Sequence, residues 1–178
     1  MGEEKGLYKK AKEEMKLSER ILAEIPGFRG YKEKEIRRET DKLIRNSLYR
    51  KLTEARKDLK EVFQQLSDQR LHEVLTDMDR LVMRFDRVAE KINHASYGYA
   101  GFFNVVKVEE KKLDKMIDFD SNLVDDVKKI VEETSAFKGE IRKRNFERAR
   151  ERIEKLRDSL ESLEETFDER EEIILGVK

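Results

Sequence analysis

Asp120 is the residue whose type and position most clearly suggest chemistry, because it is a carboxylate on an otherwise apolar helical stripe. The stripe repeats at spacings of three and four residues and consists of Leu113, Met116, Asp120, Leu123, Val127, Ile130 and Thr134. A buried carboxylate costs free energy unless a base pairs with it. If the helix of residues 31–66 runs in the same direction, Thr40 lies at the level of Asp120. Arg84 and Arg87 would then approach from an antiparallel neighbour.

Two interpretations of Asp120 are open. In the first, it lines a polar pocket where burial perturbs its pKa, as is common at functional sites. In the second, it forms a structural pair with an arginine and fixes the register of the helices, as buried polar residues do in coiled coils. We favour the structural pair.

Other residue types that carry catalysis or bind metals are sparse. There is no cysteine, which excludes thiol catalysis, zinc–thiolate sites and disulfide scaffolds. His72 and His94 are the only histidines, and neither has the Glu-x-x-His spacing of di-iron helical proteins. Serine-nucleophile and nucleotide-binding glycine motifs are absent as well. We therefore expect no metal, no cofactor and no enzymatic activity.

A second candidate surface is a cluster of aromatic residues, with an accompanying arginine, in two predicted loops. Its members are Phe28, Arg29, Tyr31, Tyr97, Tyr99, Phe102 and Phe103. In an antiparallel array of helices, both loops lie at the same end. The first interpretation is a small core that closes this end, since aromatic side chains bury large areas. The second is an exposed docking tip, because aromatics beside arginine are typical interface anchors.

The apolar pattern predicts five helices, over about residues 3–25, 31–66, 68–94, 108–134 and 140–174. The clearest signal is the heptad stripe of Leu48, Leu52, Ala55, Leu59, Val62 and Leu66. The phase changes near residues 65–69, where we favour a tight reversal over a phase slip within one long helix. Pro26-Gly27 ends the first helix, whose predicted stripe is Leu7, Ala11, Met15, Leu22 and Ile25. A further break is expected at residues 135–139.

These elements predict an all-α fold, an elongated, antiparallel, coiled-coil-like four-helix bundle with the N-terminal helix packed along it. Residues 1–178 are expected to form one domain, because no low-complexity linker divides them. Charged side chains make up 45% of the 178 residues, and there is one proline. Long exposed helices account for this composition, and the ion-pair networks of thermophilic proteins are a further interpretation.

No apolar segment reaches the roughly 20 residues that a membrane span needs, and no signal peptide is visible. The expected location is therefore cytoplasmic. The formal net charge of zero hides separate blocks of opposite sign. Residues 29–60 carry 12 basic and 6 acidic side chains, residues 142–157 carry 8 and 3, and residues 158–172 carry 1 and 8.

Our leading functional hypothesis is a non-enzymatic protein-interaction or scaffold module, including one that self-associates. The alternative is a binder of an anionic membrane surface or nucleic acid through the basic face of the 31–66 and 140–174 helices. Aromatics are few among the basic residues of the 140–174 helix, which argues against sequence-specific recognition of nucleic acid. Peripheral membrane contact stays open as a form of the alternative. A metal or ligand site around Asp120 ranks below both.

Overall fold

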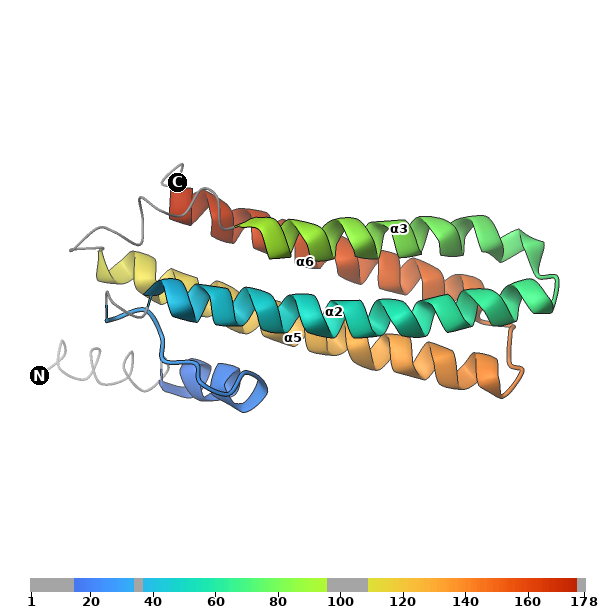
Figure 1. Ribbon diagram of the computed structural model, residues 1–178, viewed down its shortest axis with the longest axis horizontal. Coiled ribbons are helices and arrows are strands. Elements are labelled where there is room, and N and C mark those ends of the chain that lie inside the picture. The colour runs from blue at the N-terminus through green and yellow to red at the C-terminus, as the bar shows by residue number, and fades with distance from the viewer. Residues whose placement is uncertain (1–14, 34–36, 96–108, 176–178) are drawn as a thin grey trace, which may run out of the picture.

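A computed structural model of the chain describes residues 15–33, 37–95 and 109–175, which are helical between turns and contain no strand (Figure 1). The all-α prediction is therefore confirmed for these residues. The four long helices are α2 (Arg37–Asp68), α3 (His72–His94), α5 (Glu110–Arg142) and α6 (Ala149–Leu175). Residues 15–24 form a shorter helical segment beside them. No helix of the described part is long and apolar enough to cross a membrane.

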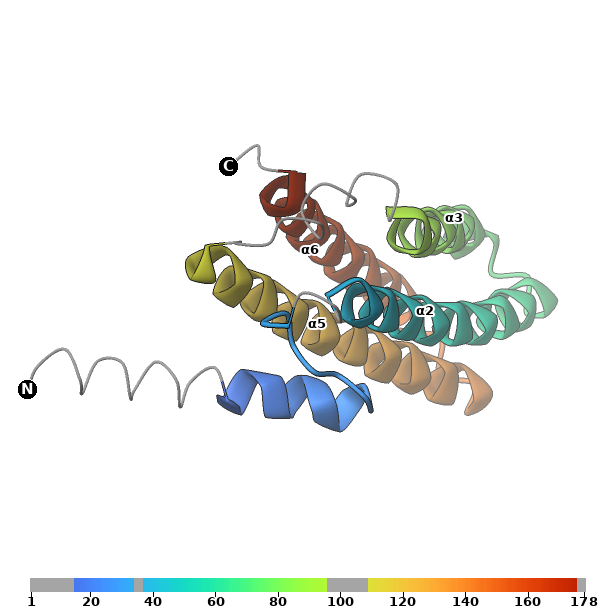
Figure 2. The ribbon, with the colours of Figure 1, turned by 60° about the vertical axis from the view of Figure 1, so that its left-hand side comes forward.

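The four long helices lie side by side, and each packs against two neighbours. Helix α2 contacts α3 and α5, and α6 also contacts α3 and α5. Figure 1 shows α2 and α5 running in one direction and α3 and α6 in the other. Consecutive helices are thus antiparallel, whereas α2 with α5 and α3 with α6 are parallel neighbours. Helices α2 and α6 lie diagonally opposite each other (Figure 2), and the α3–α6 contact is the sparsest of the four.

The core is a continuous set of apolar side chains from the predicted stripes. Leu52, Leu59, Phe85, Val127 and Leu160 are all buried within it. Packing of four apolar stripes against one another explains how a chain with 45% charged residues can fold, because most of the described charged side chains occupy the outer faces.

Both hairpin turns use an arginine where a glycine would be expected. Arg70 and Arg144 have φ angles of 57° and 60°. Leu71 N–H donates to the Leu66 carbonyl at 3.1 Å, and Asn145 N–H donates to the Glu140 carbonyl at 3.0 Å, as in Schellman caps. Residues 69–71 therefore form a tight reversal rather than a phase slip.

The predicted break at residues 135–139 is wrong, because α5 continues to Arg142. Phe137 and Ile141 extend the apolar stripe of this helix by two turns and are buried. Their burial outweighs the low helix propensity of Gly139, which costs only about 1 kcal/mol relative to alanine. The last helix begins correspondingly later, at Ala149.

The N-terminal segment packs only partly through the predicted face. Ile25 of the predicted stripe is buried, but Met15 and Leu22 are 63% and 47% exposed, and Ile21, which lies outside the stripe, is buried in their place. Glu24 fastens the segment through ion pairs to Lys51 of α2 and Lys128 of α5, at 2.7 and 2.8 Å. Two bases hold the carboxylate, so the segment lies along α2 and α5 at this point.

Candidate functional site

Asp120 is fully buried, and its partner is Arg170 of α6. Arg170 Nε donates to Asp120 Oδ1 at 2.6 Å, and its Nη2 donates to Asp41 Oδ1 at 2.9 Å and to the Tyr31 hydroxyl at 3.0 Å. Arg45 donates to the second oxygen of Asp41 at 2.9 Å. One guanidinium therefore links α2, α5, α6 and the segment before α2; we call Tyr31, Asp41, Arg45, Asp120 and Arg170 the buried ionic cluster.

The segment before α2 is held in place by side chains from the first turn of that helix. Thr40 Oγ1 donates to the Gly30 carbonyl at 3.1 Å, and Arg37 Nε donates to the Tyr31 carbonyl at 2.8 Å. Gly30 has a φ angle of 77°, a conformation that glycine adopts readily. Phe28 packs edge-on against the Tyr31 ring, with centroids 6.4 Å apart. These contacts orient the Tyr31 hydroxyl toward Arg170.

Burial dominates the electrostatics of this cluster. It raises the pKa of Asp120 above its ordinary value, although the nearby Arg170 charge opposes the shift. The pKa of Tyr31 is raised well above its ordinary value by burial and by the Asp120 charge, so this hydroxyl stays protonated. Among the described residues, Ser121 Oγ is buried without a hydrogen-bond partner.

The other residues predicted to surround Asp120 are divided between two places. Thr40 lies beside the cluster, next to Asp41 in α2. Arg84 and Arg87 lie elsewhere, because they point from α3 to α6 and pair with Glu164 at 3.5 and 3.2 Å. The expectation that they approach Asp120 is wrong: α3 lies diagonally opposite α5, so the buried centre separates them.

Sequence reasoning missed Arg170, although a signal for it exists. The apolar stripe of α6 runs through Leu156, Leu160, Leu163 and Phe167, and the same three–four spacing continues to Arg170 and Ile174. Arg170 is also the only base among eight acids in residues 158–172. A lone base at a core position of one helix is the natural partner for a lone acid at a core position of another.

The aromatic end cluster is described only in part. Phe28 and Tyr31 are buried and Arg29 is exposed. Tyr97, Tyr99, Phe102 and Phe103 lie outside the described residues. The two aromatic side chains that are described, Phe28 and Tyr31, face inward, so they do not form an exposed docking tip.

A groove of about 640 Å³ lies between α3 and α6. Its basic lining residues are Arg80, Arg84, Arg87, Arg150 and Arg157, and its acidic ones are Asp77 and Glu154. We call this the arginine groove. Its formal charge is +3, from five bases and two acids. It follows the sparsest of the four main helix contacts, between α3 and α6.

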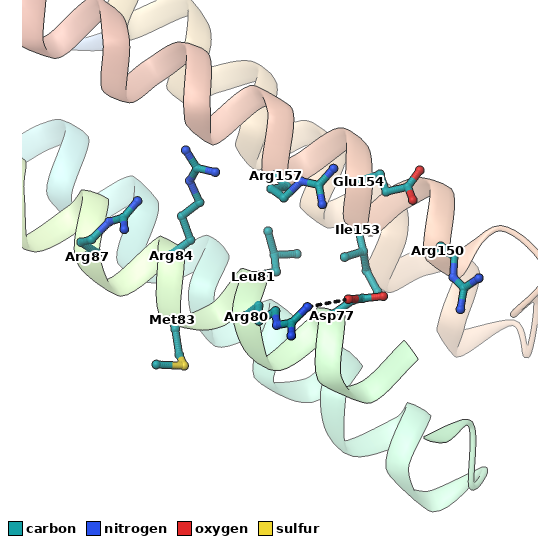
Figure 3. Close-up of a pocket in the computed structure, with 10 residues that line it drawn as sticks. All are labelled: Asp77, Arg80, Leu81, Met83, Arg84, Arg87, Arg150, Ile153, Glu154 and Arg157. Atoms are coloured by element: carbon teal, nitrogen blue, oxygen red, sulfur yellow. Dashed lines mark ion pairs between the residues drawn. The ribbon is translucent and has the colours of Figure 1, made fainter. Parts of the chain in front are cut away.

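Figure 3 shows how the side chains of the arginine groove lie. Leu81 and Ile153 are placed between the two helices and form an apolar floor, and both are buried. Arg84 reaches from α3 toward α6, whereas Met83 points away from α6 and is 64% exposed. Arg150 is exposed and has no ion pair among the described residues. The groove thus combines an apolar floor with exposed guanidinium groups.

The expected basic face shared by two helices does not form. The basic stretches at residues 29–60 and 142–157 fall largely on α2 and on the start of α6, which lie diagonally opposite each other. Most of the basic lining of the groove comes instead from α3, a helix that the charge blocks did not single out.

The two histidines are surface residues. His94 is 68% exposed and lies 3.1 Å from Glu90 one turn earlier, and His72 is exposed at the start of α3. No group of three or more metal-ligating side chains occurs within residues 15–33, 37–95 and 109–175. Comparisons with protein-family models, with curated proteins and with solved structures found no match.

Proposed function

We propose that the chain is an elongated four-helix bundle that acts as a non-enzymatic protein-binding module, with the arginine groove as its docking surface. The observation that carries this proposal is the joint presence of an apolar floor and exposed arginines in one open groove. Arginine is enriched at the centres of protein interfaces because it combines apolar stem, planar face and five donors. A partner segment with acidic and apolar residues at helical spacing fits this chemistry.

The buried ionic cluster has a structural role in this proposal. Its acids are paired with arginines inside the bundle, and none of its members lines a described pocket except Tyr31, which borders a shallow cleft beside residues 15–22. The cluster fixes the relative positions of α2, α5 and α6.

Peptide display tests the proposal, because a random library contains many candidate partner segments. Random helical peptides are selected on the immobilised protein and then re-tested on the Arg80→Glu/Arg150→Glu variant. We expect enriched peptides to carry acidic and apolar residues at spacings of three and four, and to bind the variant at least about tenfold more weakly, as loss of charge complementarity at an interface implies. Lys60→Glu/Lys129→Glu, on exposed positions of α2 and α5, is the matched control.

Nucleic acid or an anionic membrane is the competing ligand class. Fluorescence anisotropy with labelled DNA and sedimentation with anionic vesicles, both at low and moderate salt, measure it directly. Phosphate binding would show a steep loss with salt. The protein-binding proposal would be overturned if the selection enriched no acidic peptide and if DNA or anionic vesicles bound in a way that depended on the groove.

A further inference from the structure

The face that carries the arginine groove also carries an acidic patch. Glu161 and Glu164 contact Arg84, Asp168 contacts Lys91 at 2.5 Å, and Glu171 lies near Asp168 and Lys91. These four acids therefore face α3, as the groove-lining residues of α6 do. We call Glu161, Glu164, Asp168 and Glu171, together with the exposed Glu165 between them, the acidic patch.

The charge on α6 reverses along its length. Residues 149–157 carry four bases and two acids, whereas residues 158–172 carry eight acids and the single base Arg170. Arg170 is fully buried and paired with Asp120 and Asp41, so it lies behind the outward-facing acids. The pKa of Glu171 is raised by partial burial and by the neighbouring Asp168 charge, although the Lys91 and Arg170 charges oppose the shift.

We infer that two copies of this chain associate through their α3–α6 faces, with the acidic patch of each copy in the arginine groove of the other. The inference rests on the proposed function of the groove and names its partner. A two-fold axis across the helices places α6 antiparallel to α6 of the second copy. In that arrangement, the basic half of each α6 faces the acidic half of the other α6. The same contact therefore occurs twice, as an isologous interface requires.

The face is large enough for such a contact. From Arg150 to Glu171, α6 extends about 30 Å at 1.5 Å per residue. With two helices about 10 Å wide each, the projected footprint is roughly 600 Å², close to the ~800 Å² per partner that stable interfaces bury. The exposed Met83 at the edge of the groove adds an apolar contact between the two α3 helices.

Other occupants fit less well. A phosphate-rich ligand would approach the acidic patch as closely as the groove, because both lie on the same face, and like charges at an interface are unfavourable. The second copy satisfies both charged regions at once. Small molecules that fill only the groove would not contact the acidic patch.

Sedimentation velocity of the full chain over a wide concentration range tests the inference. We expect a reversible dimer that weakens as salt increases, because the contact is largely ionic. Arg150→Glu/Arg157→Glu reverses the groove, and Glu161→Lys/Glu165→Lys reverses the patch. Each variant alone should dimerise about a hundredfold more weakly, whereas the Lys60→Glu/Lys129→Glu control should match the wild type. Circular dichroism verifies that all variants remain helical.

A mixture of the two reversed variants is the decisive measurement. In the mixed dimer, both contacts join opposite charges again, so native mass spectrometry should show the heterodimer in preference to either homodimer. A wild-type chain that stays monomeric at low salt, or reversed variants that dimerise normally, would overturn the inference. So would a mixture that fails to associate. If acidic peptides still bind the groove of a monomeric wild type, the proposed function stands and only self-association fails.

Discussion

Replacing Arg170 by methionine should destabilise the protein strongly, because it removes the base that compensates Asp120. The side chains of Arg170 and Asp120 are both fully buried and joined at 2.6 Å. At a charge separation of about 4 Å and an effective dielectric constant of about 20, their attraction is roughly 4 kcal/mol. Breaking a buried pair by removing one partner costs about 3–5 kcal/mol, since the remaining charge stays desolvated, and we expect a loss in this range.

The loss should depend on pH in a definite direction. Without Arg170, burial raises the folded-state pKa of Asp120 further above its unfolded value. The folded state then takes up a proton first, so the stability of the variant rises as pH falls through the folded pKa. The gain levels off below the unfolded pKa. The gap between the variant and the wild type should therefore narrow from pH 7 toward pH 4, because protonation removes the unpaired charge.

Urea unfolding followed by circular dichroism measures these free energies at each pH. The variant Arg170→Met/Asp120→Leu removes both charges, and its stability should exceed that of Arg170→Met at pH 7, since an apolar pair of similar volume needs no compensation. Asp41 keeps Arg45 as a partner in both variants. A loss below about 1 kcal/mol in Arg170→Met, the range of an exposed ion pair, would refute the reasoning. Equal stability of the single and double variants at every pH would refute it as well.

Three further predictions concern the N-terminal segment, helix α5 and the turn after α5. Hydrogen bonds from Lys128 and Lys51 lower the pKa of Glu24 to about 2; the stability they provide is present above pH 4.5 and is lost as pH falls toward 2. Glu24→Gln should therefore cost on the order of 1 kcal/mol at pH 7 after allowance for solvent screening, and nothing near pH 2, by urea unfolding. Gly139→Ala should stabilise the protein by about 0.5–1 kcal/mol, since the position is helical and no atom lies within 4 Å of an added Cβ; a lower thermal midpoint would contradict this. Arg144→Gly should raise the thermal midpoint by a few degrees through relief of about 1 kcal/mol at its positive φ, and an unchanged or lower midpoint would show that the side chain compensates.

The helices and their buried faces could be predicted from the sequence because periodicity is a local property. The stripes from Leu48 to Leu66 and from Ile153 to Phe167 depend only on residues within one helix. The burial of Asp120 followed from the same local pattern. The positions of the turns were harder to predict from the sequence. Both hairpins place an arginine in the left-handed conformation, and the glycine at position 139 lies inside a helix.

The contacts of each residue with other helices could not be predicted in the same way. They depend on which helices are neighbours, and the pattern within one helix does not contain that information. Arg84 and Arg87 were expected near Asp120 because the order of the helices around the centre was unknown. Once α3 is placed beside α6, the same arginines line a groove with Arg150 and Arg157 instead. The arginine groove has no linear signature, because its two halves are separated by the whole of α5.

The buried ionic cluster has a consequence for the rates of folding and unfolding. Arg170 contacts residues that are 50, 129 and 139 positions away in the chain. The α2–α3 and α5–α6 hairpins, in contrast, close over short turns, so we expect them to form first. Contacts that form after the transition state slow unfolding and leave the folding rate nearly unchanged. We therefore expect Arg170 to slow the unfolding of the chain and to have little effect on its folding rate.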